Sequence, residues 1–191
     1  MYNIVVFASG SGSNALNLIR HFNGQGFAEV KAVFCNKKNA GVLEKAQQAG
    51  VPTRVFNRGD YYETDTVIQE VAAYKPDIIV LAGFLWLVPE SFIHAFEGKI
   101  INLHPSLLPK FGGKGMYGHF VHEAVLAAGE PRTGISVHLV NAEFDKGEII
   151  YQDSFEILPG SSVSDIESQI HQLEHIGLPI AVEQFLSKRK I

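Results

Sequence analysis

An asparagine and a histidine close an apolar run in the middle of the chain, where they could stabilise negative charge. The segment is Ile100-Ile101-Asn102-Leu103-His104-Pro105. Strand side chains alternate between faces, so Asn102 and His104, two positions apart, are predicted to point the same way. Pro105 cannot donate to a sheet ladder, which predicts that pairing stops there. An amide and an imidazole side by side can both donate to one developing oxyanion.

A second apolar run leads into an acidic loop, His138–Gly147. Asp145 in this loop is the expected partner of His104. A carboxylate near an imidazole favours the imidazolium, so the pairing predicts a raised pKa and a protonated His104. His138 lies on the strand before the loop, where it serves either as a structural imidazole or as part of the site.

A glycine-rich turn, Gly10-Ser11-Gly12-Ser13-Asn14-Ala15, follows the first apolar run. Glycines permit a tight turn, and the free N–H groups at a helix start attract an anion. The turn also meets the relaxed dinucleotide pattern G-x-G-x-x-A. The next expected strand closes in Cys35-Asn36-Lys37-Lys38, without the acid that holds a dinucleotide ribose. A single phosphate is therefore favoured over NAD, and NADP would depend on the two lysines.

Composition narrows the class of protein. The 191 residues fit one domain, 1–191, and 46% apolar with 19% charged residues indicates a globular chain. A net charge of −4 argues against a general nucleic-acid or anionic-membrane binder. No apolar run approaches the ~20 residues of a membrane span. The single cysteine, Cys35, cannot form an internal disulfide, which predicts a reducing, cytoplasmic setting.

Apolar runs alternate with helical patterns in the first half, which predicts an α/β fold. The fold class is Rossmann-like: a mostly parallel, doubly wound sheet with helices on both faces and a more irregular C-terminal part. Strands are predicted at residues 3–8, 30–35, 53–56 and 77–81, with a further strand ending at Asn102. Helices are predicted at 14–21, 41–49 and 61–73.

The order of elements changes after residue 102. Residues 103–118 are predicted to be loop, followed by a helix at 119–128. Strands at 133–140 and 148–157 are expected to form a hairpin around the acidic loop. A final helix should begin with Ser162 or Ser164 as its N-cap and run to about residue 186. An interruption is expected near Gly177 and Pro179.

A metal centre is not predicted, although the chain has eight histidines. His119 and His122 are three apart on an expected helix, but no further ligand is evident beside them. Neither the H-E-x-x-H nor the C-x-x-C spacing of metal sites occurs.

Taken together, Asn102-x-His104, the loop with Asp145 and the turn at Gly10–Asn14 resemble the folate-dependent formyltransferases. The resemblance extends from about residue 3 to about residue 186. It implies transfer of a formyl group from 10-formyltetrahydrofolate, a co-substrate, to the amine of glycinamide ribonucleotide in purine biosynthesis. Asn102, His104 and Asp145 would be the catalytic residues, with no metal.

The resemblance also assigns binding roles. Gly12, Ser13 and Asn14 would hold the substrate phosphate, and Glu174 its ribosyl or amine part. The folate would be held by Arg58, by the strip Leu85, Trp86, Leu87 and Val88, and by the loop residues Asn141, Ala142, Glu143 and Phe144. The chain departs from the family pattern at Trp86, where many relatives place arginine. It also has Ala142 where an acid is common and Leu139 where an aromatic is common.

Other readings remain open at this point. A formyl-folate hydrolase or a methionyl-tRNA formyltransferase would share the Asn-x-His and Asp elements. From another class, the glycine turn could serve an NADP oxidoreductase or a non-catalytic nucleotide-binding module. The expected partners are small-molecule substrates, in a monomer or homodimer.

Overall fold

The computed structural model describes residues 1–143 and 145–188. Two compact units make up the chain, Met1–Ile101 and the part from Asn102 onward. The strand order is β3-β2-β1-β4-β5-β6-β7, which confirms the predicted α/β class. The strands are β1 (Tyr2–Ala8), β2 (Ala28–Cys35), β3 (Thr53–Val55), β4 (Ile78–Leu81), β5 (Ile100–His104), β6 (Arg132–Leu139) and β7 (Ile149–Glu156). The expectation of one domain over 1–191 stays a prediction.

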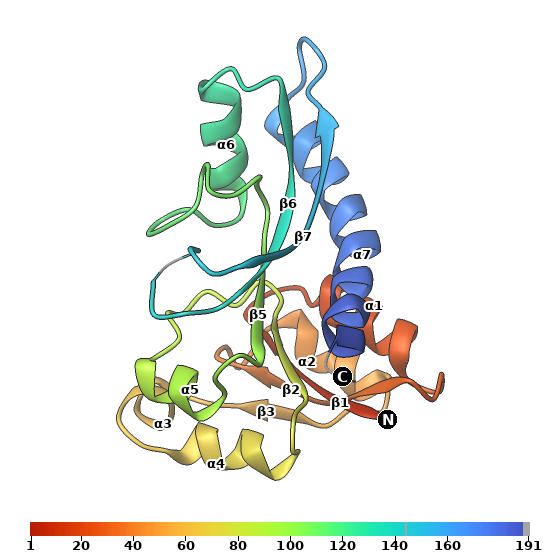
Figure 1. The fold of residues 1–191 in the computed structure, drawn as a ribbon, viewed down its shortest axis with the longest axis vertical. Helices are drawn as coiled ribbons and strands as arrows, with labels where there is room; N and C mark the ends of the chain where they lie inside the picture. Colours follow the sequence, from red (N-terminus) through yellow and green to blue (C-terminus); the bar gives the residue numbers. More distant parts are fainter. Residues whose placement is uncertain (144, 189–191) are drawn as a thin grey trace. The chain divides into compact units, whose positions relative to one another are not determined.

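The first unit is built on parallel strands. β1 pairs in parallel with β2 and with β4, and β2 pairs in parallel with β3. Every residue of β4 is buried, as its continuous apolar run predicts for a strand covered on both faces. Figure 1 shows α1 (Ser13–Phe22) and α2 (Gly41–Gln48) on one side of β1–β3 and α4 (Thr66–Ala73) on the other.

The strand order explains this distribution of helices. The chain moves outward from β1 to β2 and β3, then returns past β1 to form β4. Right-handed crossovers made in opposite directions place their helices on opposite faces. The direction in which successive strands are added to the sheet therefore reverses between β1 and β4. The loops that follow these two strands are joined by a hydrogen bond of 3.1 Å from Ser9 N to Gly83 O. Open α/β sheets bind ligands at such a switch point.

Two details of the first unit differ from the sequence-based expectation. The helix predicted at 61–73 is two helices, α3 (Arg58–Tyr62) and α4. A capping box between Asn57 and Asp60 starts α3 early, and Thr64 Oγ bonds Asp60 O and Thr66 N, ending one helix and beginning the next. The short helix α5 (Glu90–Ala95) was not predicted.

In the second unit, β5 runs to His104, two residues beyond the predicted end. β6 and β7 are antiparallel, which confirms the hairpin, and α6 (His119–Ala127) matches its prediction closely. Ser162 caps the last helix, α7 (Val163–Lys188), because Ser162 Oγ accepts from Asp165 N at 3.2 Å and Asp165 Oδ2 accepts from Ser162 N at 2.9 Å.

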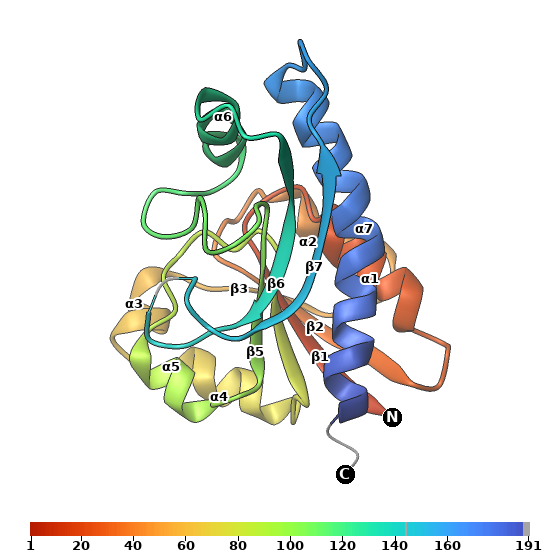
Figure 2. The same ribbon diagram turned by 45° about the horizontal axis from the view of Figure 1, so that its top comes forward.

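The expected interruption of α7 is wrong. The helix is continuous through Gly177 and Pro179 and lies along β6 and β7 (Figure 2). A Cβ on Gly177 would stand 2.6 Å from the Tyr151 ring and 2.7 Å from Ile135 Cδ1, so glycine allows the helix to approach the hairpin closely. Pro179 removes one N–H, but this part of the helix is buried, and its packing outweighs the lost hydrogen bond.

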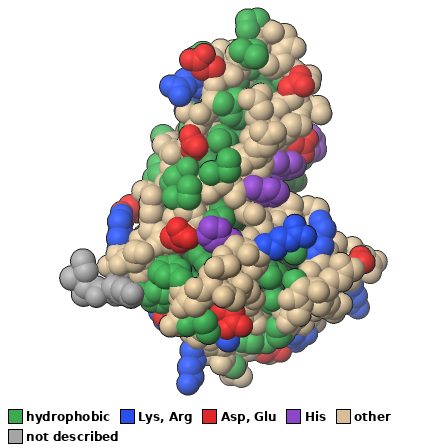
Figure 3. All heavy atoms as spheres, turned by 90° about the vertical axis from the view of Figure 1, so that its right-hand side faces the viewer, with side chains coloured by type: hydrophobic (Ala, Val, Ile, Leu, Met, Phe, Trp, Pro, Cys, Tyr) green, Lys and Arg blue, Asp and Glu red, His purple; other side chains and the backbone are tan. Residues whose placement is uncertain are grey.

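Charges of both signs are interspersed on the face seen in Figure 3, in keeping with a net charge of only −4. Among the helices that the structure describes, none has the length and apolar character needed to cross a membrane.

Candidate functional site

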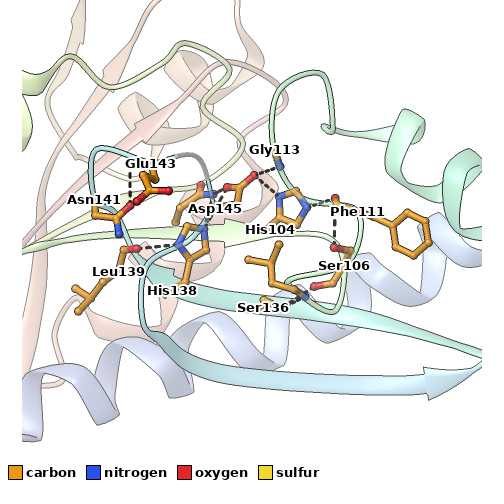
Figure 4. A network of polar contacts seen from close by, with 12 residues as sticks. His104, Ser106, Phe111, Gly113, Ser136, His138, Leu139, Asn141, Glu143 and Asp145 are labelled. Atoms are coloured by element: carbon orange, nitrogen blue, oxygen red, sulfur yellow. Dashed lines mark hydrogen bonds and ion pairs between the residues drawn. The ribbon is translucent and has the colours of Figure 1, made fainter.

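A polar network in the second unit contains the three residues expected to be catalytic, and Figure 4 shows two of them, His104 and Asp145. His104 and His138 are buried, and Asn102 and Asp145 are partly exposed. Asp145 lies at its centre. Its Oδ2 accepts from the Gly113 N–H at 2.8 Å and stands 3.8 Å from His104 Nδ1. Its Oδ1 stands 3.4 Å from His138 Nε2 and 3.5 Å from Asn102 Nδ2. The structure therefore brings Asn102, His104 and Asp145 together and adds His138.

His138 is oriented by the backbone. Its Nδ1 lies 2.8 Å from the carbonyl oxygen of Leu139, which can only accept, so Nδ1 carries a hydrogen. Its Nε2 lies 3.2 Å from the Asn102 amide nitrogen and 3.4 Å from Asp145 Oδ1. His138 thus contacts both of these side chains from β6.

His104 is held by a second backbone carbonyl. Its Nε2 lies 2.8 Å from the oxygen of Phe111, and only 4% of the residue is exposed. Burial lowers the pKa of His104, and this outweighs the raising effects of Asp145 and of the Phe111 carbonyl. The prediction of a raised pKa is therefore wrong in its net direction. Asp145 acts with the expected sign, but desolvation dominates and the resting imidazole is neutral at pH 7.

Asp145 is ionised at neutral pH. Burial by itself raises the pKa of its carboxyl, but the contacts with His138 and the Gly113 N–H, together with nearby His104, hold that pKa below its ordinary value. The residue has a left-handed backbone with φ of 52°, which aspartate tolerates better than most residues. A neutral imidazole beside a carboxylate is an arrangement that can accept a proton and then stabilise the cation.

The amide nitrogen of Asn102 lies within reach of two groups of the network, 3.2 Å from His138 Nε2 and 3.5 Å from Asp145 Oδ1. The contact with Asp145, at 3.5 Å, is at the limit of a hydrogen bond. The N–H on that side is the one that a stronger acceptor, such as an oxyanion, can take over.

The glycine turn belongs to the first unit and has the expected strand–turn–helix setting. Ser13 and Asn14 begin α1, whose N-terminus has Gly12 as N-cap and no side-chain cap. Gly12 has a φ of 77°, and a Cβ there would stand 2.5 Å from Val42 Cα. The glycine is thus required by the packing of the turn on α2 as well as by any ligand.

A cavity of about 540 Å³ opens beside this turn. It is lined by Ser9, Gly10, Lys37, Lys38, Asn39, Ala40 and Gly41. The lysines are the pair that follows β2, and residues 12–14 do not line the cavity.

The apolar strip after β4 is fixed to the turn by a bond from Leu85 N to Ser9 Oγ of 3.0 Å. Leu85 and Leu87 are 47% and 51% exposed, while Val88 is buried. Trp86 is half-buried, and its ring packs against those of Phe56, Tyr61, Tyr62 and Phe84.

Arg58 joins this aromatic group from the start of α3. Its guanidinium carbon lies 5.1 Å from the Trp86 ring centre and 5.8 Å from that of Tyr62. Tyr62 is anchored in turn, because its hydroxyl donates to the Leu87 carbonyl at 2.9 Å. Trp86 therefore holds the predicted arginine through cation–π contact.

The remaining predicted residues lie in the second unit. Asn141, Ala142 and Glu143 are exposed, and Asn141 Oδ1 accepts from Glu143 N at 3.0 Å. Phe144 lies outside the described residues. Glu174 is on α7 and is only 9% exposed, so it is not an ordinary surface carboxylate.

No sequence pattern predicted the backbone groups of Phe111 and Gly113 that contact His104 and Asp145. Their role depends on a turn whose path no local pattern reveals, although the run of glycines after Pro109 indicated an unusual loop. Within the part of the chain that the structure describes, no group of three or more His, Cys, Asp or Glu side chains is placed to hold a metal ion.

Comparison with known proteins defines the class. The formyl transferase family matches residues 2–182, and the chain belongs to this family. The phosphoribosylglycinamide formyltransferase of Escherichia coli (strain K12) is 36% identical over 193 residues, covering 98% of this chain and 88% of the relative. That of Bacillus subtilis (strain 168) is 34% identical, covering 97% and 95%. The crystal structure of phosphoribosylglycinamide formyltransferase from Brucella melitensis superposes with a TM-score of 0.87 at 39% identity, covering 97% and 95%.

Proposed function

We propose that the protein transfers a formyl group from 10-formyltetrahydrofolate to the amine of glycinamide ribonucleotide. The observation that carries the proposal is the network in which His104 Nδ1 lies 3.8 Å and Asn102 Nδ2 lies 3.5 Å from the Asp145 carboxylate. The names of the relatives supply the substrate, and the network supplies chemistry that suits it.

The first step is attack of the substrate amine on the formyl carbon. A C–N bond forms, and the carbonyl electron pair moves to oxygen. The amine loses a proton, which neutral His104 can accept as a general base. Asp145 then stabilises the imidazolium across the 3.8 Å separation.

The second step is collapse of the tetrahedral intermediate. The bond from the formyl carbon to the folate nitrogen breaks, and that nitrogen receives the proton held by His104. The Asn102 amide donates to the oxyanion between the two steps, when its weak contact with Asp145 is replaced. His104 and Asp145 end in the protonation states in which they began.

Binding roles follow the resemblance and are assigned within each unit. In the first unit, Gly12, Ser13 and Asn14 take the phosphate at the uncapped start of α1, where free N–H groups and the helix dipole favour an anion.

The folate roles are assigned to the strip Leu85–Val88 and Arg58 in the first unit. The exposed leucines and the Trp86 ring offer an apolar surface for a flat heterocycle. In the second unit, Asn141–Phe144 contribute to folate binding and Glu174 contacts the ribosyl or amine part. The substrates are small molecules. A cytoplasmic location and a monomeric or homodimeric state remain part of this proposal.

One assay tests the function. The protein is mixed with 10-formyltetrahydrofolate, with and without glycinamide ribonucleotide, and formation of tetrahydrofolate is followed by absorbance. We expect formyl loss only when the amine is present. Loss without the amine would identify a hydrolase, and no change in either mixture would contradict formyl transfer.

A further inference from the structure

Two serines outside the predicted site, Ser106 and Ser136, are completely buried in the second unit. Ser136 Oγ donates to Ser106 O at 2.6 Å and accepts from Leu108 N at 3.0 Å and from Gln152 Nε2 at 2.8 Å. A hydroxyl has one donor and two acceptor positions, so this one is fully used. Gln152 Nε2 also donates to Leu108 O at 3.0 Å. The turn after β5 is therefore tied to β6 and β7.

Ser106 extends these bonds along the turn. Its Oγ donates to the Lys110 carbonyl at 2.8 Å and lies 3.5 Å from the carbonyl oxygen of Phe111. The Phe111 oxygen is the atom that contacts His104 Nε2. Figure 4 shows Ser106 and His104 on either side of this carbonyl.

The backbone is strained where this carbonyl is presented. Phe111 has a φ of 56°, a left-handed conformation that a bulky residue adopts only when its surroundings impose it. Gly112 follows, and a Cβ there would stand 2.5 Å from Leu108 Cδ2 and 3.2 Å from Asp145 Cβ. The turn is thus forced into a path that directs the Phe111 carbonyl at His104 and the Gly113 N–H at Asp145.

A carbonyl oxygen can only accept, so it retains the hydrogen of a neutral His104 on Nε2. The other nitrogen, Nδ1, is then basic and is the atom that faces Asp145. We propose that Ser106 and Ser136 are positioning residues for formyl transfer: they hold the Phe111 carbonyl against Nε2, which makes Nδ1 the atom of His104 that takes up and returns the proton. The catalytic role of His104 in this inference rests on the proposed function, but its tautomer does not.

Nitrogen-15 NMR of the imidazole rings tests the tautomer directly, with the His104 signals assigned by comparison with His104→Gln. The ligand-free protein should show a protonated Nε2 and a basic Nδ1 for His104. A hydrogen on Nδ1 would overturn the proposal. This measurement needs no substrate, so it stands or fails separately from the assay of formyl transfer.

Ser106→Ala and Ser136→Ala then test the positioning role. Each should shift His104 toward a mixture of tautomers and lower kcat by roughly 10- to 100-fold, the scale of a small misplacement, with little change in either KM. Ser106→Cys, which keeps a weak donor, should recover part of the rate. Ser164→Ala removes an exposed serine of α7 and serves as the control.

Thermal unfolding of each variant separates positioning from folding. A lower Tm with an unchanged His104 tautomer and unchanged kcat would show that the serines only stabilise the turn, which overturns the proposal. If Ser106→Ala does not fold, Ser136→Ala alone carries the test, because it breaks the bond from Ser136 Oγ to the Ser106 carbonyl. A wild-type tautomer and a wild-type kcat in folded Ser136→Ala would overturn the proposal.

Discussion

The glycine turn with its aromatic strip in the first unit and the polar network in the second are built on different principles. The first presents backbone N–H groups, exposed leucines and ring faces, with its glycine required by packing on Val42. The second consists of buried and half-buried side chains that contact one another and the backbone groups of Phe111 and Gly113. Binding through backbone and apolar surface tolerates changes of side chain, whereas proton transfer requires particular groups at particular atoms.

The positions at which the sequence was expected to depart from the family pattern, Trp86, Ala142 and Leu139, lie in the strip or at the acidic loop, outside the network. The contacts expected there are apolar or made by backbone. Substitutions should therefore cost most in the network and least in the strip.

Asp145→Asn should have the largest effect. It keeps the shape but removes the charge that stabilises the imidazolium, so kcat should fall by ~10²–10⁴, the usual contribution of acid–base catalysis. His104→Ala should cost a similar amount, and the double variant should be non-additive because the pair acts as a unit. Steady-state kinetics of the three variants, with exposed Glu156→Gln as control, checks this.

The pH dependence of activity tests the coupling of His104 with Asp145. His104 must be neutral to accept a proton, so activity should be lost as the pH falls through its pKa, which burial places below the ordinary value. Asp145 raises that pKa, so Asp145→Asn should move the acid limb to still lower pH. If the acid limb of Asp145→Asn does not move, the proposed coupling between the two residues is contradicted.

Asn102→Ala should have the next largest effect on the rate. Removal of one donor to an oxyanion typically lowers the rate by ~10²–10³, and the loss should appear in kcat more than in either KM. Asn102→Asp is a sharper variant, because it places an acceptor where the Asp145 carboxylate requires a donor. Wild-type turnover in Asn102→Ala would remove this residue from the mechanism.

Two glycines of the same turn provide a matched pair for the first unit. Gly12→Ala forces a Cβ against Val42 at a φ of 77°, so it should lower the free energy of unfolding by ~1–3 kcal/mol. Gly10→Ala places its methyl group in open space and should leave stability within ~0.5 kcal/mol. Denaturant unfolding measures both.

The Gly10 variant also tests ligand binding. A methyl group there should raise the KM for the ribonucleotide while leaving that for formyl-folate unchanged, if a phosphate approaches the turn. Equal changes in both constants would contradict the assignment of the phosphate to this turn.

Trp86→Leu should have the smallest effect. An exposed cation–π contact is worth ~0.5–1 kcal/mol, so loss of the ring that holds Arg58 should raise the KM for formyl-folate about two- to fivefold. Trp86→Phe keeps a ring face and is the matched control. Trp86 is the only tryptophan, so its fluorescence in the wild type should be quenched by a folate analogue and not by glycinamide ribonucleotide alone. A large fall in kcat for Trp86→Leu would contradict the separation of binding from chemistry.

The elements with a clear hydrophobic period were predicted well, and each error has an identifiable cause. The Asn57 capping box and the Thr64 hydroxyl divided one expected helix into two, through local side-chain hydrogen bonds. Pro179 was expected to interrupt α7, but the close approach permitted by Gly177 buries the helix against β6 and β7 and keeps it continuous. Residue preference alone indicates neither outcome.

Local sequence patterns were sufficient to predict the alternation of strands and helices, the glycine turn, and the residue types available for chemistry at Asn102, His104 and Asp145. These features are local, because side-chain period and turn chemistry act over a few neighbouring residues. The protonation of His104, in contrast, depends on the packing of distant segments. Its pKa follows from burial, which depends on the packing of β5, β6 and the turn around Phe111, and this desolvation exceeds the effect of the carboxylate that the sequence had singled out.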